Sequence, residues 1–213
     1  MTELQKVIPA EIETRSFEII GEELKDMGII LEPENELVIK RAIHTSADFD
    51  YAGNLIFSDY VVKDTVELFK KGNVTIVTDT NMAKAGINKK MCKKLGVEVK
   101  CFMADEDVAE NAKKNGSTRA VASMEKAAEI EGNLIFAIGN APTALVKLDE
   151  LIKLGKINPQ LIIGVPVGFV NVVESKEIIL ESGVPFIVAN GRKGGSNVAA
   201  AICNALLYMT GKR

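Results

Sequence analysis

Short apolar segments rich in β-branched residues recur along the chain and predict the strands of a sheet. All but one are nearly continuous apolar runs, which is typical of parallel strands buried on both faces. The exception, residues 97–101, carries Glu98 and Lys100. Helical patterns separate most of these segments, so we expect a right-handed βαβ series in an open sheet. The five predicted strands are residues 74–77, 97–101, 134–138, 161–165 and 186–189.

Amphipathic helical patterns fill much of the remaining chain. In the first of them, Phe17, Ile20, Leu24 and Met27 recur at helical spacing, and Gly28 follows as a candidate C-cap. The first 70 residues contain no predicted strand, so we expect an N-terminal helical flank beside the sheet. The predicted helices are residues 11–27, 34–45, 59–71, 82–95, 105–115, 118–131, 142–154, 175–182 and 196–209.

Chain length and pattern together predict one α/β domain, residues 1–213. Its core is a mostly parallel open sheet of about five strands, with helices on both faces. Hydrophobic residues make up 47% of the chain and charged residues 26%, an ordinary globular balance.

Composition and charge exclude several classes of protein. A net charge of −3 argues against a nucleic-acid partner. The longest apolar run, residues 161–170, is too short for a membrane span, and residues 1–9 lack the pattern of a signal peptide. We therefore expect a soluble, cytoplasmic protein without nucleic-acid or membrane partners.

Cysteine spacing gives no sign of a metal site. Cys92, Cys101 and Cys203 are scattered and form no C-x-x-C pair, which argues against zinc and against a disulfide framework. We expect all three to be small buried apolar residues, and we expect no metal.

Ligands of open α/β sheets collect outside the carboxyl ends of parallel strands. At four of these ends the sequence has unusual turns, one of which contains Asp79 and Thr80. A second, which begins at Gly139, fits an ordinary βα turn with proline at the first helical position. The four turns are residues 78–80, 139–143, 166–169 and 190–196.

The last of these turns is the best candidate for binding an anion. Its glycines, including Gly191, permit close backbone approach, and it leads into a helix N-terminus, where exposed amides attract anions. Arg192 and Lys193 add positive charge. The spacing matches neither a P-loop nor a dinucleotide fingerprint. A flexible glycine turn with solvated basic residues explains the pattern equally well.

The only histidine, His44, is the sharpest feature of the first half of the chain. It lies near the end of a predicted helix, three residues after Arg41, so the two side chains share a face. The helix C-terminus, with Asp48 and Asp50 close behind it, favours a protonated imidazole that could serve as a general acid. A lone histidine is more often structural, and metal ligation is the weaker alternative.

Three further polar residues are candidates for contacts with a ligand, although local salt bridges could explain two of them. Arg119 opposes the dipole at the start of its predicted helix, which an acidic ligand or a nearby carboxylate would offset. Arg15 could form a surface salt bridge with Glu11, four residues earlier. Ser16 lies beside the core stripe without a capping role, which leaves a ligand contact open.

Several stretches in both halves of the chain together resemble the precorrin-8X methylmutase family, which includes a cobalt-precorrin-8 branch. In the first half they are Thr14-Arg15-Ser16-Phe17, Arg41-Ala42-Ile43-His44-Thr45 and Ala47-Asp48-Phe49-Asp50. In the second half they are Thr118-Arg119-Ala120, residues 138–145, residues 164–170, Glu174-Ser175-Lys176 and residues 191–196.

The resemblance implies an isomerase that moves a methyl group from ring position 11 to 12 of a corrin precursor, without a redox cofactor. It implies that His44 is the catalytic proton donor or acceptor. It also implies a homodimer or larger assembly, with the site near a subunit interface. The residues expected to bind the polycarboxylate macrocycle are Arg15, Ser16, Arg41, Thr80, Arg119, Gly191 and Arg192.

Short differences from other family members bear on the branch. Thr45, Ser46, Ala47 and Asp48 follow the motif histidine where some members have Cys-Gly, which resembles the cobalt-using branch. Two other functions stay open. One is a hydrolase or lyase on a sugar phosphate that uses Asp79 and the 190–196 turn. The other is a non-catalytic tetrapyrrole carrier.

Overall fold

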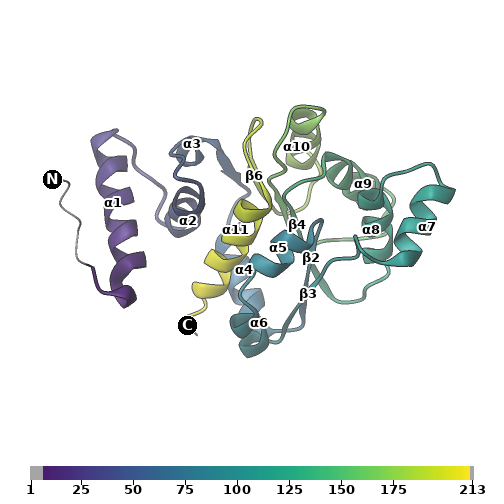
Figure 1. Cartoon of the computed structure of the whole chain (residues 1–213), viewed down its shortest axis with the longest axis horizontal. Helices are drawn as coiled ribbons and strands as arrows, with labels where there is room; N and C mark the ends of the chain where they lie inside the picture. The colour runs from purple at the N-terminus through teal and green to yellow at the C-terminus, as the bar shows by residue number, and fades with distance from the viewer. Residues whose placement is uncertain (1–6, 212–213) are drawn as a thin grey trace.

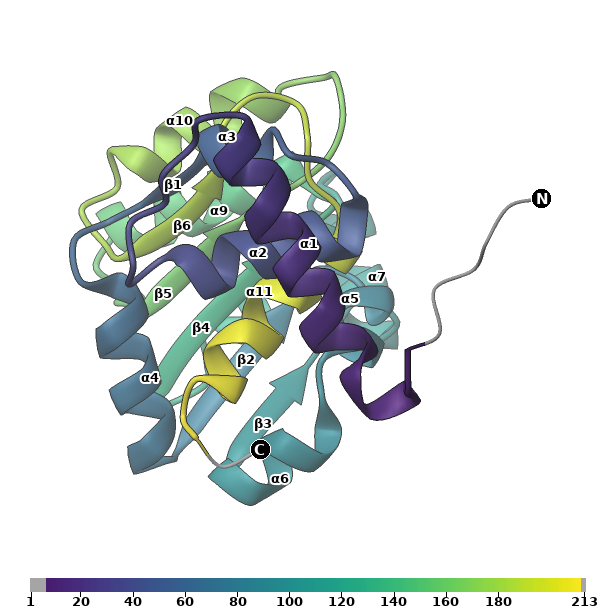
Figure 2. The same ribbon diagram turned by 90° about the vertical axis from the view of Figure 1, so that its left-hand side faces the viewer.

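The protein folds around a six-stranded α/β sheet. The computed structural model, drawn in Figure 1, describes residues 7–211. Its strand order is β1-β6-β5-β4-β2-β3 (Figure 2). Only β1 runs antiparallel to its neighbour, so the expected mostly parallel sheet is confirmed. The strands are β1 (Leu55–Phe57), β2 (Val74–Thr78), β3 (Val97–Lys100), β4 (Asn133–Ile138), β5 (Leu161–Gly164) and β6 (Phe186–Ala189).

Central strand β4 shows why most strand segments are nearly continuous apolar sequences. It pairs with β2 on one side and β5 on the other, with Ile135 opposite Ile76 and Leu161. Its alternate side chains enter two separate cores. Ile135 packs into one core and Phe136 into the other, and neither is exposed. Both faces of the strand must therefore be hydrophobic.

Helices cover both faces of the sheet, as expected. One core contains α4 (Val61–Lys71), α6 (Lys89–Leu95) and α11 (Ser196–Tyr208), and α5 (Asn81–Gly86) packs on α11. The other contains α8 (Arg119–Ala127), α9 (Pro142–Lys153) and α10 (Val172–Leu180), and α7 (Glu106–Lys114) packs outside α8.

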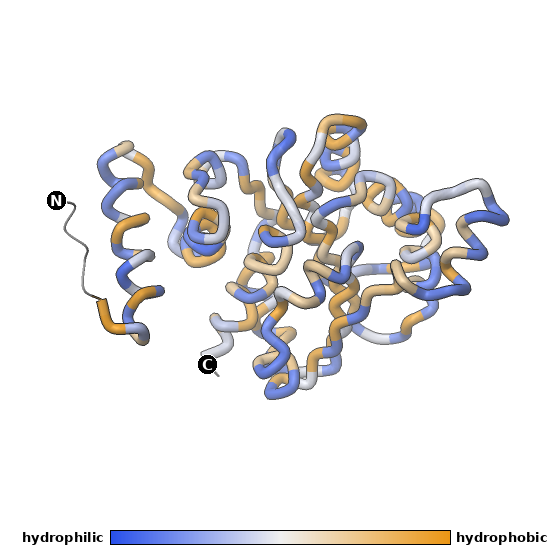
Figure 3. The backbone as a smooth tube through the Cα atoms, in the orientation of Figure 1, coloured by the Kyte–Doolittle hydropathy of each residue, from blue (hydrophilic) through white to orange (hydrophobic). Residues whose placement is uncertain are grey.

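The N-terminal helices form an additional layer. Helix α2 (Glu36–Ser46) packs on α11, and α1 (Ile12–Asp26) packs on α2, so α1 lies at one end of the molecule (Figures 1 and 2). Hydrophobic and hydrophilic residues alternate along α1 (Figure 3), and the buried ones include Ile20 and Leu24. A 3₁₀ turn, η1 (Pro9–Glu11), precedes α1, and the short α3 (Tyr51–Asn54) follows α2.

Two expectations about the elements were wrong. The first 70 residues are not entirely helix and loop, because β1 pairs with β6, with Leu55 opposite Ala189. Residues 82–95 do not form one helix either. The chain breaks after α5, and the Asn88 side chain accepts a hydrogen bond from the amide of Met91, which caps α6.

Candidate functional site

His44 lies in the last turn of α2, where its side chain is exposed. The helix ends there because Ala47 adopts a left-handed conformation with φ of 53°. The His44 ring meets Phe17 of α1 edge to face, with ring centroids 5.6 Å apart. This contact supports one side of the imidazole and leaves the rest open to a ligand.

Arg41, one turn earlier on α2, is almost completely buried. Its guanidinium forms two hydrogen bonds with Glu13 of α1, at 2.9 and 3.3 Å. It also lies over the rings of Phe17 and Tyr208, at 4.9 and 5.0 Å from their centroids. Arg41 and His44 therefore both contact Phe17, as their spacing predicted, but the arginine charge already has a carboxylate partner.

The two predicted site residues of α1 make local contacts. The Ser16 hydroxyl donates to the carbonyl of Ile12 at 2.8 Å. Arg15 pairs with Glu18 at 3.0 Å and Glu22 at 3.6 Å, so the ion pair predicted with its i−4 neighbour is replaced by pairs farther along the helix. Ser16 adjoins Phe17 in sequence, whereas Arg15 is held by acidic neighbours.

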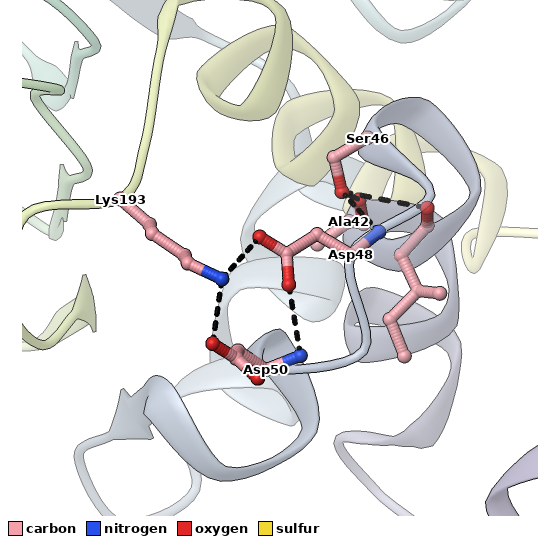
Figure 4. A network of polar contacts seen from close by, with 6 residues as sticks. Ala42, Ser46, Asp48, Asp50 and Lys193 are labelled. Carbon is pink, nitrogen blue, oxygen red and sulfur yellow. Dashed lines mark hydrogen bonds and ion pairs between the residues drawn. The ribbon is translucent and has the colours of Figure 1, made fainter.

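Lys193 connects the region after His44 to the turn after β6. Its ammonium bridges Asp48 at 2.6 Å and Asp50 at 2.5 Å (Figure 4). Hydrogen bonds to these two carboxylates raise the pKa of Lys193 to about 12, and the bond to Lys193 lowers the pKa of Asp48. The sequence placed both aspartates near His44. The structure directs them to Lys193 instead.

The turn of residues 190–195 packs tightly against two other turns at the carboxyl edge of the sheet. Gly195 donates its amide to the carbonyl of Val165 at 2.9 Å. A Cβ on Gly194 would lie 2.0 Å from that same carbonyl oxygen, and one on Gly139 would lie 2.7 Å from the carbonyl oxygen of Gly195. Glycine is required here by close backbone approach.

Asp79, at the end of β2, holds another of these turns. Its carboxylate accepts the amides of Gly139, Asn140 and Ala141 at 2.6 to 2.9 Å. Burial raises its pKa, while these amide bonds act in the opposite direction. A fully buried carboxylate with three amide donors is a structural anchor. It is not placed to serve as the ligand or base that a sugar-phosphate hydrolase would need.

The remaining predicted residues lie around the same edge of the sheet. Thr80 caps α5, and its hydroxyl is 2.8 Å from that of Ser196, the first residue of α11. Arg192 is exposed and lies over the ring of Phe169, 5.4 Å from its centroid. Arg119 is exposed at the start of α8, which a threonine pair, Thr118 and Thr143, connects to the start of α9.

Lys176 of α10 is a polar residue that the sequence reasoning passed over. It is 1% exposed, and its ammonium donates to the carbonyls of Gly191 at 2.7 Å and Lys193 at 2.9 Å. Burial lowers its pKa to about 8. The signal was present, because Val172 and Ile179, its buried neighbours at i−4 and i+3, place a lysine on an apolar helix face.

Metal ligation, membrane insertion and cysteine pairing are the remaining properties to consider for residues 7–211. This part of the chain holds no group of three or more His, Cys, Asp or Glu side chains arranged to hold a metal ion. None of its helices combines the length and apolar character needed to cross a membrane. All three cysteines are free and buried, as predicted.

Comparisons with known proteins assign the family. The family model described as precorrin-8X methylmutase matches residues 11–209. A cobalt-precorrin-8 methylmutase of Leptospira interrogans is 43% identical over 210 residues, covering 95% of this chain and 94% of the relative. The Salmonella typhimurium relative of the same name is 43% identical over 204 residues, covering 94% and 95%. A precorrin-8X methylmutase of Sinorhizobium is 36% identical over 194 residues, covering 90% of each chain.

A solved structure agrees with these relatives. The precorrin-8x methyl mutase of Thermus thermophilus superposes with a TM-score of 0.85 at 35% identity, covering 94% of this chain and 98% of that one. The family model, the relatives and this structure each extend over nearly the whole chain. The chain belongs to the precorrin-8X methylmutase family.

Proposed function

We propose that this chain is a cobalt-precorrin-8 methylmutase, an isomerase that moves a methyl group from ring position 11 to ring position 12 of a corrin precursor. Family membership supports the isomerase activity. The cobalt branch is supported by the relatives named for cobalt-precorrin-8, which are more similar to this chain than the Sinorhizobium precorrin-8X methylmutase. Cobalt here belongs to the substrate, and the protein supplies the surrounding groups.

One observation carries the proposal. The exposed imidazole of His44 and the glycine turn after β6 belong to distant parts of the chain, and Lys193 fastens them together through Asp48 and Asp50. A proton-transfer group is thereby held in fixed relation to the turn that carries the exposed guanidinium of Arg192. A macrocycle edged with carboxylates needs that pairing of functions.

His44 acts in this proposal as the group that gives a proton to the corrin system or takes one from it. Methyl migration redistributes charge over the conjugated ring, so a positioned proton donor stabilises the transition state more than the bound substrate. The edge contact with Phe17 fixes the orientation of the imidazole. The remaining work is positioning of the macrocycle.

The carboxylates of the substrate are bound by dispersed cations, hydroxyls and amides. Arg192 and Arg119 are the exposed cations of the carboxyl edge. Arg41 contributes positive charge beside His44, and a substrate carboxylate would reach its guanidinium only by displacing Glu13. Gly191 supplies close backbone approach, and the further proposed contacts are Ser16, Thr80 and Arg15.

The test is turnover of cobalt-precorrin-8, followed by the absorption change that accompanies loss and reformation of conjugation. His44→Ala should still bind the corrinoid, while kcat falls about 10²- to 10⁴-fold, the usual range for loss of a general acid or base. Lys126→Met, which removes a lysine in the last turn of α8 that binds Asp105 and Asp107, should leave kcat unchanged. Full turnover by His44→Ala would refute the proton-transfer role.

The same experiment distinguishes the isomerase from the remaining alternative, a non-catalytic tetrapyrrole carrier. A tetrapyrrole carrier would bind corrinoids tightly but would show no absorption change with either cobalt-loaded or metal-free substrate. Turnover of the metal-free form alone would contradict the assignment to the cobalt branch.

We also propose a homodimer in the cytoplasm. Helix α1 lies at one end of the molecule and carries exposed apolar side chains such as Ile12, 53% exposed. Unpaired cysteines are the rule in reducing compartments. Sedimentation equilibrium should give twice the 23.0 kDa chain mass, and a mass of 23.0 kDa would refute the dimer. Cell fractionation tests the compartment.

A further inference from the structure

Lys176 is a buried cation whose two hydrogen bonds are both to backbone carbonyls. It projects from α10 beneath the turn of residues 190–195, where its ammonium reaches the carbonyls of Gly191 and Lys193. Within the described residues it forms no ion pair. Burying a charge costs free energy, and here two hydrogen bonds to carbonyls offset that cost without an opposite charge.

These two hydrogen bonds determine which way the peptide groups of the turn face. The chain has no cis peptide bond among the described residues, and in a trans peptide the carbonyl and the following N–H point in opposite directions. Because Lys176 draws the carbonyls of Gly191 and Lys193 inward, the amides of Arg192 and Gly194 face outward.

The outward amides are unused by the protein itself. Neither the Arg192 amide nor the Gly194 amide donates to an acceptor within residues 7–211. The guanidinium of Arg192 and the first residues of α11 lie beside them in sequence. Two free amides, a guanidinium and a helix N-terminus, all within a few residues of one another, are groups that bind a carboxylate.

We propose that Lys176 is a positioning residue, which orients the Arg192 and Gly194 amides toward a carboxylate of the substrate. The identity of that carboxylate, on a corrin precursor, rests on the proposed function. Lys176 itself contacts no substrate in this arrangement, because the turn lies between them.

The test uses the full-length protein and two ligands. Amide NMR spectra of the wild type are recorded while metal-free hydrogenobyrinic acid, and separately citrate, is added. The Arg192 and Gly194 amide signals should shift with both ligands. In Lys176→Met, which keeps an unbranched side chain one atom shorter and removes the donors, those shifts should disappear.

Kinetics distinguish orientation of the amides from a general structural effect. Lys176→Met should raise the KM for cobalt-precorrin-8 and the Kd for hydrogenobyrinic acid by about tenfold or more, the expected loss for charge-assisted hydrogen bonds. Its kcat should stay within about threefold, because the binding lost is shared by substrate and transition state. Lys126→Met should match the wild type in every measurement.

Several results would overturn the proposal. These are wild-type Arg192 and Gly194 signals that do not move with either ligand, an unchanged Kd in Lys176→Met, or a fall in kcat without a rise in KM. If Lys176→Met does not fold, the wild-type spectra alone test the proposal, through the shifts of the Arg192 and Gly194 amide signals. If the wild type neither binds nor converts corrinoids, the proposed function fails, and the citrate shifts still test Lys176.

Discussion

At the scale of single residues, Arg41 shows how a residue near the site can also support the fold. It is 9% exposed, and its charge is balanced by Glu13 and two aromatic rings. Helix α1 is therefore fastened to α2 by a charged contact next to His44. The helical spacing of Arg41 and His44 predicted their shared face, but the pairing with a glutamate 28 residues earlier had no local signal.

Removing the charge of Glu13 should destabilise the protein. Glu13→Gln leaves the buried Arg41 without its counter-charge, and we expect a loss of about 1–3 kcal/mol in the free energy of unfolding. Urea denaturation measures this loss. Glu18→Gln, which breaks the exposed pair with Arg15, is the matched control and should have a much smaller effect. Equal losses in the free energy of unfolding for the two variants would show that the buried pair of Glu13 and Arg41 stabilises the protein no more than an exposed pair.

The Lys193 bridge should matter to catalysis more than to folding. Its ammonium and both aspartates are at least partly exposed, so Lys193→Met should leave the melting temperature nearly unchanged. We expect kcat/KM to fall about tenfold, because His44 and the turn lose their common anchor. Raising the ionic strength should lower kcat/KM of both proteins, because the substrate is a polycarboxylate, but more for the wild type, in which salt also weakens the bridge. An unchanged kcat/KM would contradict this role.

At the scale of elements, the sequence predicted the helices and strands that have a clear hydrophobic periodicity. It missed the elements whose conformation depends on contacts with distant segments of the chain. The apolar runs predicted four of the five parallel strands and the turns that follow them, and β3 was predicted although Glu98 and Lys100 interrupt its pattern. Strand β1 was not predicted because its three residues, Leu55 to Phe57, are too few to establish an alternating pattern. Pairing with β6 determines their conformation. The break before α6 depends on Asn88, whose amide is held by Asn204 of α11.

The residues of the candidate site also divide into those with a local sequence signature and those that depend on distant contacts. His44, Arg119 and the glycine turn could be identified from local sequence, because helix ends and glycine clusters have local signatures. The Lys193 bridge and the contact between Lys176 and the turn could not, because each depends on segments that meet only in the folded chain.

The glycines of the packed turns should tolerate no side chain. Gly194→Ala places a Cβ against the carbonyl of Val165, and we expect a loss of about 1–3 kcal/mol in the free energy of unfolding together with weaker corrinoid binding. Gly53→Ala is the control, because a Cβ there has open space and an ordinary φ. It should be neutral or slightly stabilising. Thermal or urea denaturation of both variants checks the difference.

At the scale of the whole molecule, the buried charge of Lys176 couples folding to pH. Its pKa is about 8 in the folded protein and 10.5 in the unfolded chain. Between these values the unfolded chain binds more protons, so this lysine makes unfolding less favourable as pH rises. The cost of burying its charge is fully present below pH 8.

The expected outcome is a pH-dependent difference between two proteins. The free energy of unfolding of the wild type, minus that of Lys176→Met, should rise between pH 8 and pH 10.5. Other groups that titrate in this range, such as Cys92, with a pKa raised to about 11, cancel in the difference. Urea denaturation at several pH values measures it. A difference that is flat or falls over this range would show that Lys176 is not buried as a charge.

The orientation of the turn by Lys176 has a consequence for how the site can be mapped. The groups offered to the ligand at Arg192 and Gly194 are main-chain N–H groups, which side-chain replacement does not remove. A mutational scan of the turn would therefore report the lost Arg192 guanidinium and the steric cost at the glycines, but not the two amides. The position that reports them is Lys176 on α10, below the turn and away from the surface that meets the ligand.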